Sequence, residues 1–109
     1  MEARKVTAIV RRTLLEKVEE RLQAIRVPGI SVTTVKGYGE YADFYRHNWQ
    51  VTHARIEIFT VRRRAAKIAA AIVDAAHTRA PGDGIVVVLP VETVYRIRTR
   101  AEATEPDLD

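Results

Sequence analysis

Short apolar segments that alternate with polar residues, or are rich in β-branched residues, occur at five places along the chain. Alternation places one face of a strand against a core, and β-branched side chains are favoured in strands. This pattern predicts strands at residues 5–10, 30–35, 55–59 and 85–89, with a short extra strand at 94–99. The dense apolar run at 85–89 is typical of a buried strand.

Two further segments carry apolar residues at spacings of three and four, as amphipathic helices do. The first runs from Thr13 to the residues before Pro28, and Thr13 with Glu16 predicts a capping box at its start. The second follows Thr60, the expected cap, and ends near Thr78. Its apolar face is rich in alanine, which lets the helix lie close to a sheet.

The predicted order is strand, helix, strand, strand, helix, strand. This order is typical of the α+β ferredoxin-like βαββαβ sandwich, an antiparallel sheet with two helices on one face. The other face of the sheet then needs a cover or a partner. The length of 109 residues fits a single domain. The acidic tail at 102–109 contains Pro106, and we expect it to be flexible.

Two loops and two arginines are candidate functional elements. The segment 40–53 is polar and aromatic with no period, and loops of that length are usually functional or mobile. The loop 78–84 carries two glycines two positions apart, which allow close backbone approach to an anion. Arg96 and Arg98 alternate along the last predicted strand and are expected to share a face that binds phosphate. The alternative is a hairpin turn and an edge strand with solvated arginines.

Composition excludes some classes of function but does not identify one. The net charge of +4 permits nucleic acid, acidic partners or phosphorylated ligands. The chain has no cysteine, which excludes disulfides and thiol chemistry. We expect no signal peptide and no membrane span, and therefore a cytoplasmic protein. No catalytic triad or Walker motif is present and the histidines lack ligand spacing, so we expect neither an enzyme nor a metal site.

Four motifs, in order, resemble those of the PII signal-transduction protein family. Residues 32–39 (VTTVKGYG) resemble the strand and glycines before the family's long T-loop, and residues 55–58 resemble the strand after it. Thr78 with Gly82-Asp83-Gly84 resembles the B-loop, and residues 96–99 (RIRT) are similar to the C-terminal phosphate-binding motif. Together they span nearly the whole chain, which therefore resembles a divergent PII-like protein with a shortened T-loop.

This resemblance implies a homotrimer whose open sheet faces pack around a three-fold axis. It also implies that ADP, AMP or ATP binds in clefts between subunits, with no other cofactor. The nucleotide-binding residues it implies are Ser31, Gly37, Gly39, Phe59, Gly82, Asp83, Gly84, Arg96 and Arg98. The loop would then signal to a protein partner such as a transporter or a metabolic enzyme. Its candidate contacts are Tyr41, Phe44, Tyr45 and Trp49.

Four positions depart from the family pattern. Tyr41 matches the glutamine that helps to hold 2-oxoglutarate and Mg-ATP, and His53 matches a lysine that contacts 2-oxoglutarate. Ile85 matches the B-loop lysine that reaches the outer phosphates, and Arg79 matches the first B-loop glycine. We therefore expect ADP or AMP to bind at least as tightly as ATP.

The residues leave three alternative functions open. RNA recognition modules share the strand and helix order, but they need aromatic residues on the open sheet face. The third predicted strand offers only Phe59. A sensor of a small anion such as bicarbonate, within the same family, is the second alternative. An acyl-phosphate hydrolase ranks last, because no arginine-rich phosphate loop follows the first strand.

Overall fold

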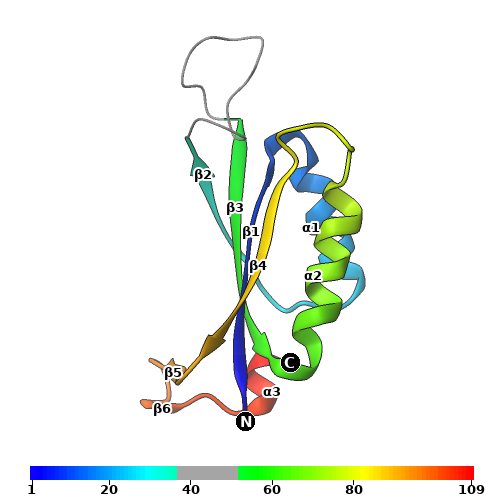
Figure 1. Ribbon diagram of the computed structural model, residues 1–109. Helices are drawn as coiled ribbons and strands as arrows, with labels where there is room; N and C mark the ends of the chain where they lie inside the picture. Colours follow the sequence, from blue (N-terminus) through cyan, green and yellow to red (C-terminus); the bar gives the residue numbers. More distant parts are fainter. Residues whose placement is uncertain (37–51) are drawn as a thin grey trace.

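The computed structural model describes residues 1–36 and 52–109 (Figure 1). Its main sheet is antiparallel, in the order β2-β3-β1-β4, and two helices cover one face. The predicted ferredoxin-like arrangement is confirmed. The strands are β1 (Ala3–Arg11), β2 (Ser31–Val35), β3 (His53–Val61) and β4 (Gly84–Val91). The helices are α1 (Leu15–Ala24), which follows a 3-10 turn η1 (Arg12–Leu14), and α2 (Arg62–Ala76).

The core lies between the sheet and the two helices. Every second residue of β1 and β3 faces the helices, and these positions are almost fully buried. Leucine, isoleucine and valine of the two helices fill the other side. The principal members are Val6, Val10, Val18, Leu22, Ile56, Ile58, Ile68 and Ile72. The alanines of α2 at 65, 75 and 76 are also buried, as expected for a helix close to a sheet.

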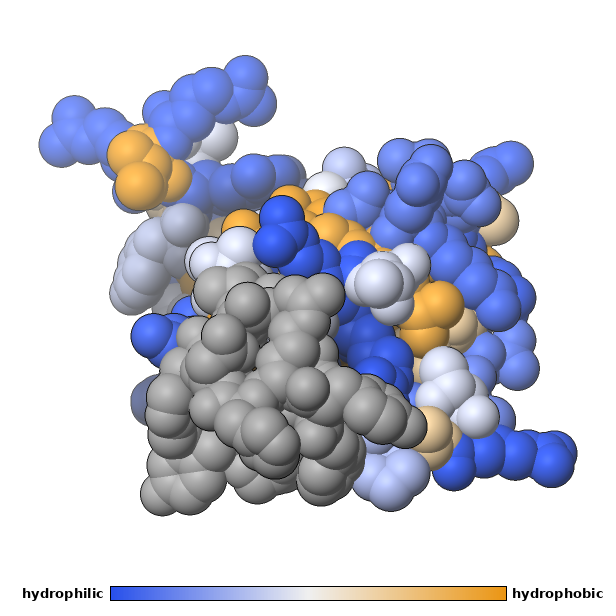
Figure 2. Space-filling view, turned by 90° about the horizontal axis from the view of Figure 1, so that it is seen from above, coloured by the Kyte–Doolittle hydropathy of each residue, from blue (hydrophilic) through white to orange (hydrophobic). Residues whose placement is uncertain are grey.

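The opposite face of the sheet stays open in this single chain. Phe59 lies opposite Lys5 and is 47% exposed, while Ile85 and Leu89 of the edge strand β4 are 45% and 42% exposed. The prediction of a buried strand at 85–89 is therefore wrong for the single chain, because no described element covers the outer side of β4. Figure 2 looks down on one end of the molecule, where hydrophobic residues lie between hydrophilic ones.

The chain after β4 forms a small hairpin that projects from the main body (Figure 1). It consists of β5 (Tyr95–Arg96) and β6 (Ala101–Glu102). The predicted strand at 94–99 is wrong, because the chain turns at residues 97–100, where Arg100 has φ 61° and its N–H donates to the Arg96 carbonyl at 2.9 Å. The turn separates Arg98 from the strand that carries Arg96.

The C-terminal segment is ordered, which contradicts the expectation of a flexible tail. It forms a short helix, α3 (Glu105–Leu108), with a capping box between Thr104 and Asp107. Leu108 is 7% exposed and belongs to a second apolar cluster with Ala3 and Val61. Proline is favoured in the first turn of a helix, so Pro106 is compatible with this element.

Neither predicted threonine cap is present. Thr13 lies inside η1, and α1 has no side-chain cap. Thr60 lies in β3, which runs directly into α2, and its hydroxyl donates to the Leu108 carbonyl at 3.3 Å. The β3 strand continues two residues further than predicted, so Thr60 serves the second cluster and not the helix.

Gly84 allows the closest approach between β4 and β1. Its φ is +103°, and a Cβ there would lie 1.8 Å from the carbonyl oxygen of Ile9. We expect Gly84→Ala to lower the free energy of unfolding by more than about 2 kcal/mol, since both backbone strain and a backbone clash oppose it. Urea denaturation followed by circular dichroism measures this. Gly29→Ala is the matched control, because a Cβ at Gly29 meets nothing within 4 Å. Equal effects of the two changes would contradict this account.

Candidate functional site

One carboxylate organises the glycine loop at residues 78–84. Asp83 accepts hydrogen bonds from the Thr78 N–H at 2.8 Å, the Arg79 N–H at 3.1 Å and the Thr78 hydroxyl. The Arg11 Nε lies 3.2 Å from the same carboxylate. The loop therefore closes on the side chain of its own penultimate residue.

These donors change the acidity of Asp83. The hydrogen bond from the Thr78 hydroxyl, aided by the two backbone N–H groups and Arg11, lowers the pKa of Asp83 to about 2, against the opposing effect of burial. The carboxylate is charged at neutral pH and fully engaged in holding the loop. The N–H groups of Thr78 and Arg79 are thereby occupied, which leaves the glycine segment 82–84 as the part of the loop suited to an external anion.

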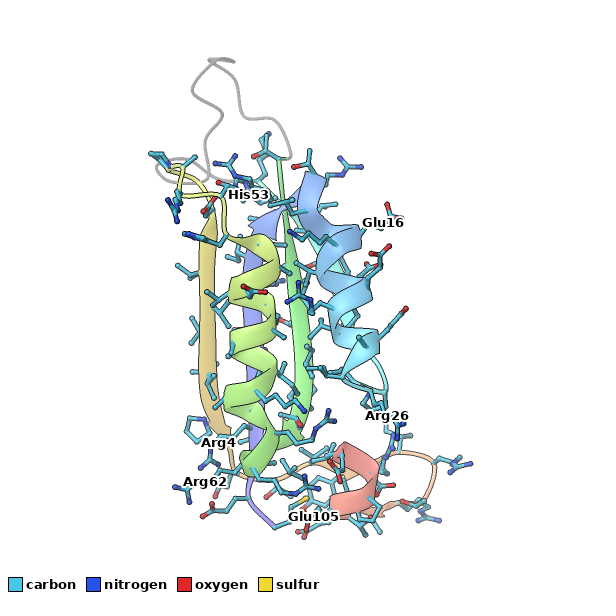
Figure 3. The ribbon with its side chains drawn as sticks, turned by 90° about the vertical axis from the view of Figure 1, so that its right-hand side faces the viewer. Arg4, Glu16, Arg26, His53, Arg62 and Glu105 are labelled. Carbon is cyan, nitrogen blue, oxygen red and sulfur yellow. The ribbon has the colours of Figure 1, made fainter. Side chains whose placement is uncertain are left out.

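Two side chains from the sheet hold the loop from below. Arg11 donates from Nη2 to the Pro81 carbonyl at 2.6 Å, and the His53 Nε2 lies 2.7 Å from the Gly82 carbonyl. A carbonyl oxygen only accepts, so Nε2 of His53 carries the proton. Its Nδ1 lies 2.7 Å from the Thr52 hydroxyl. Figure 3 shows His53 at the upper end of β3, beside this loop.

The position that the resemblance assigns to a 2-oxoglutarate contact is thus structural in this chain. His53 is 2% exposed and committed to the loop. Arg79, at the position of the family's first B-loop glycine, has φ 70°. Gly82 and Gly84 have φ 96° and 103°. All three lie in the left-handed region that glycine adopts readily, which accounts for a glycine at the matching family position.

A second feature lies at the other end of the sheet. It is a groove of about 500 Å³ between the start of β2, the end of β3, the hairpin and α3. Three of the predicted nucleotide residues, Ser31, Phe59 and Arg96, line it. The other lining residues are Pro28, Gly29, Ile30, Glu57, Val94, Tyr95, Asp107 and Leu108.

Arg96 is the cation of this groove, and it has a partner within the chain. Its Nη2 lies 3.6 Å from Oδ1 of Asp107 and donates to the Asp107 carbonyl at 3.4 Å. Arg98 lies in the turn at 97–100 and does not line the groove. The prediction that both arginines share one strand face is therefore wrong.

One chain does not bring the predicted site residues together. Gly84 pairs with Val10 and Phe59 pairs with Lys5, which places the glycine loop and the groove five residues apart along β1. At about 3.3 Å per residue, this separation is about 17 Å. Gly37, Gly39 and the candidate partner contacts Tyr41, Phe44, Tyr45 and Trp49 lie outside the described residues. Within one chain, the predicted site residues therefore fall into two separate groups, one at the glycine loop and one at the groove.

The run Arg62-Arg63-Arg64 at the start of α2 pairs with acidic residues from both ends of the chain. Arg62 bonds Glu2 at 2.8 Å, Arg63 bonds Glu105 at 3.1 Å and also Asp109, and Arg64 lies 3.7 Å from Asp109. Figure 3 shows Arg62 and Glu105 together at the lower end. These carboxylates offset the unfavourable position of cations at a helix N-terminus.

Metal-binding clusters and membrane-spanning helices are both absent from residues 1–36 and 52–109. No group of three or more acidic or histidine side chains there is arranged to hold a metal ion. Within the same ranges, no helix has the length and apolar character needed to cross a membrane.

Three residues of the loop and the groove lie beyond what sequence reasoning predicts. Arg11 has no sequence signal, because a contact across more than seventy residues leaves no local pattern. Tyr95 has no signal beyond that of a strand residue. Asp107 had a signal, since Thr104 followed three residues later by an acidic side chain is a capping pattern.

Comparison with known proteins identifies the family. The family model described as "Nitrogen regulatory protein P-II" matches residues 3–101. The chain belongs to the P-II family. A relative named Nitrogen regulatory protein P-II from Cereibacter sphaeroides is 37% identical over an alignment of 103 positions, which covers 88% of this chain and 92% of the relative. One from Cyanidium caldarium is 35% identical over an alignment of 112 positions, gaps included, which covers 96% of each chain.

A solved structure agrees with the sequence matches. It is the Arabidopsis thaliana PII bound to citrate, with a TM-score of 0.78 and 30% identity, covering 93% of this chain and 85% of that chain. The resemblance drawn from the motifs is confirmed. The P-II family protein described here is a signal-transduction regulatory protein with a ferredoxin-like fold, and family membership gives no support to the RNA-binding or hydrolase alternatives.

The low pKa of Asp83 predicts an acid-sensitive loop. The folded pKa of about 2 lies below the ordinary value of 3.8, so this carboxylate stabilises the fold above pH 4 and loses that effect as the pH falls from about 4 to 2. We expect Asp83→Asn to lower the free energy of unfolding at pH 7 by about 1–2 kcal/mol, allowing for partial solvent screening. Its deficit relative to the wild type should shrink below pH 4. Urea denaturation at a series of pH values measures both.

Asp74→Asn is the control for Asp83→Asn. Asp74 pairs with Arg21 on the outer faces of the helices, and its side chain is 71% exposed. We expect this variant to unfold like the wild type at pH 7. A deficit of Asp83→Asn that stays constant down to pH 2 would refute the assignment of the low pKa to this loop.

Proposed function

We propose that this P-II family member is a homotrimer that binds an adenine nucleotide in clefts between subunits. It signals the bound state to a protein partner, such as a transporter or a metabolic enzyme, through the loop at 40–53. One observation supports this most directly: the residues that the family resemblance assigns to a single nucleotide site lie in two places in one chain, the groove and the glycine loop, about 17 Å apart. A neighbouring subunit completes each site.

The groove suits the nucleoside part and the first phosphate. Phe59 and Tyr95 supply aromatic surface, and Ser31 supplies a hydroxyl for hydrogen bonding. The guanidinium of Arg96 is a bidentate donor matched to phosphate oxygens. A volume of about 500 Å³ is within the range of small-molecule pockets. Arg98, in the turn of the projecting hairpin, is the proposed second phosphate contact.

The glycine loop suits the remaining phosphates. Arg11, His53 and Asp83 fix its backbone before any ligand arrives, which reduces the entropy lost on binding. Gly82 and Gly84 have no side chain between the backbone and an anion. The proposed contacts are therefore the backbone groups of residues 82–84, with Gly37 and Gly39 as expected neighbours.

The preference for ADP or AMP has two physical supports. Ile85 occupies the position of the family's lysine and carries no charge to neutralise an outer phosphate. The charged carboxylate of Asp83 lies within the loop itself and repels further negative charge. Each added phosphate therefore contributes less binding free energy in this chain than in a relative with the lysine.

A small-anion sensor is the second candidate. The Arabidopsis relative is described as bound to citrate, an anion without a base or ribose. Arg96 and the glycine loop would serve a carboxylate as well as a phosphate. Titration with bicarbonate and citrate beside the nucleotides separates the two candidates, since a nucleotide sensor binds ADP far more tightly.

Calorimetric titration with AMP, ADP and ATP tests the ligand. We expect ADP or AMP to bind at least as tightly as ATP, and Arg96→Ala to weaken ADP by about 1.5–3 kcal/mol, the usual range for a hydrogen bond to a charged group. Arg62→Ala is the control, because Arg62 pairs with Glu2 outside the groove. A tenfold preference for ATP, or unchanged ADP binding in Arg96→Ala, would disprove the assignment.

Light scattering of the purified protein tests the assembly. We expect the mass of a trimer, because the exposed apolar residues of the open sheet face need a cover. Leu89→Asp places a charge on that face and should reduce the mass toward that of a monomer. Val73→Asp is the matched control: Val73 is 53% exposed on α2, and its variant should stay trimeric. A monomeric wild type at micromolar concentration would exclude the trimer.

A further inference from the structure

We propose that Asp107 acts as an internal anion at the nucleotide groove, competing with ligand phosphate for Arg96 and thereby selecting ligands that carry fewer phosphates. This inference rests on the proposed function and assigns a specificity-determining residue to that site.

The two carboxylate oxygens of Asp107 have different partners. Oδ2 accepts hydrogen bonds from the Thr104 N–H at 2.7 Å and the Thr104 hydroxyl at 3.0 Å. Oδ1 lies 3.6 Å from Nη2 of Arg96. The capping box therefore fixes the carboxylate and directs its second oxygen toward the arginine. The Asp107 carbonyl accepts a hydrogen bond from the same Nη2 at 3.4 Å.

The segment that carries Asp107 is anchored to the body of the protein. Leu108, the next residue, is 7% exposed and packs with Ala3 and Val61. Its carbonyl accepts the Thr60 hydroxyl at 3.3 Å. Asp107 therefore lies beside Arg96, and an incoming phosphate meets an arginine that is already paired with a carboxylate.

The other charges of the groove do not replace Arg96. Glu57 also lines the groove, and it lies 3.3 Å from Lys5 and 3.5 Å from Arg55. Among the described residues, the charged side chains that line the groove are thus one arginine and two carboxylates. Because repulsion by Asp107 grows with the charge of the ligand, ATP is opposed more strongly than ADP, and ADP more strongly than AMP.

The chain supplies a matched control on the same segment. Asp109 also carries a carboxylate of the C-terminal segment, but it pairs with Arg63 and Arg64 and does not line the groove. Asp109→Asn removes the same charge from the same segment at a different place. It separates an effect at Arg96 from a general effect of tail charge.

Isothermal titration of the protein with AMP, ADP and ATP tests the proposal, using wild type, Asp107→Asn and Asp109→Asn. For Asp107→Asn we expect ATP to tighten by about fivefold, ADP by about threefold and AMP by less than about twofold at low salt. The gain should shrink at 0.5 M salt, since screening weakens exposed charges. Asp109→Asn should bind all three as the wild type does.

Two further variants distinguish competition from a structural role. Thr104→Val removes the hydroxyl hydrogen bond but keeps both the carboxylate and the backbone N–H that holds it at 2.7 Å, so we expect no gain graded by charge. Adding Asp107→Asn to Arg96→Ala should tighten nucleotide binding less, relative to Arg96→Ala, than Asp107→Asn alone does relative to the wild type. The reason is that the arginine for which the two anions compete is gone. Thermal unfolding confirms that each variant is folded at the titration temperature.

The outcomes separate this inference from the proposed function. A wild type that binds nucleotide, with Asp107→Asn showing no gain or an equal gain for all three, overturns the inference and leaves the function standing. A wild type that binds none of the three overturns the proposed function. Because the inference rests on that function, it is overturned in the same case.

Discussion

The carboxylate of Asp83 fixes the junction between α2 and β4, and the geometry of the upper end of the sheet depends on it. It draws the Thr78 end of the loop and Arg11 of β1 onto one point. Gly84 follows at once and lets β4 approach β1 so closely that a methyl group has no room. With Asp83 holding the loop and Gly84 opening the strand pair, the residues between them have little conformational freedom left to lose.

Charge organises the lower end in a different way. The chain has more basic than acidic residues, yet several of its arginines are matched by carboxylates near the two termini. Most of these pairs are exposed, and such pairs contribute little stability individually. These pairs mainly position α3 and the hairpin relative to the groove. Burial of Leu108 supplies the apolar contact that holds this arrangement in place.

The sequence predicted the ferredoxin-like order and the core faces well. Positions that are buried at regular intervals carry apolar residues at the same intervals, such as Val6, Val10, Ile68 and Ile72. It predicted the glycine loop from local chemistry. It failed where distant parts of the chain meet. The local pattern at Thr60 predicts a helix cap, whereas its hydroxyl bonds the Leu108 carbonyl 48 residues away, a contact that leaves no local pattern. The alternation of Arg96 and Arg98 indicates a strand. The turn at 97–100 depends instead on an arginine, Arg100, in the left-handed backbone conformation, which no simple sequence pattern predicts.

The two chain ends also set how the protein can be handled. Both lie at the end of the sheet opposite the glycine loop (Figure 1). β1 alone has nine residues, so about 30 Å of sheet separates the ends from that loop. Asp109 is held by the arginines of α2, whereas Met1 is 60% exposed. Attachment to a sensor surface through residue 1 would therefore leave the glycine loop facing the solution and the C-terminal ion pairs intact.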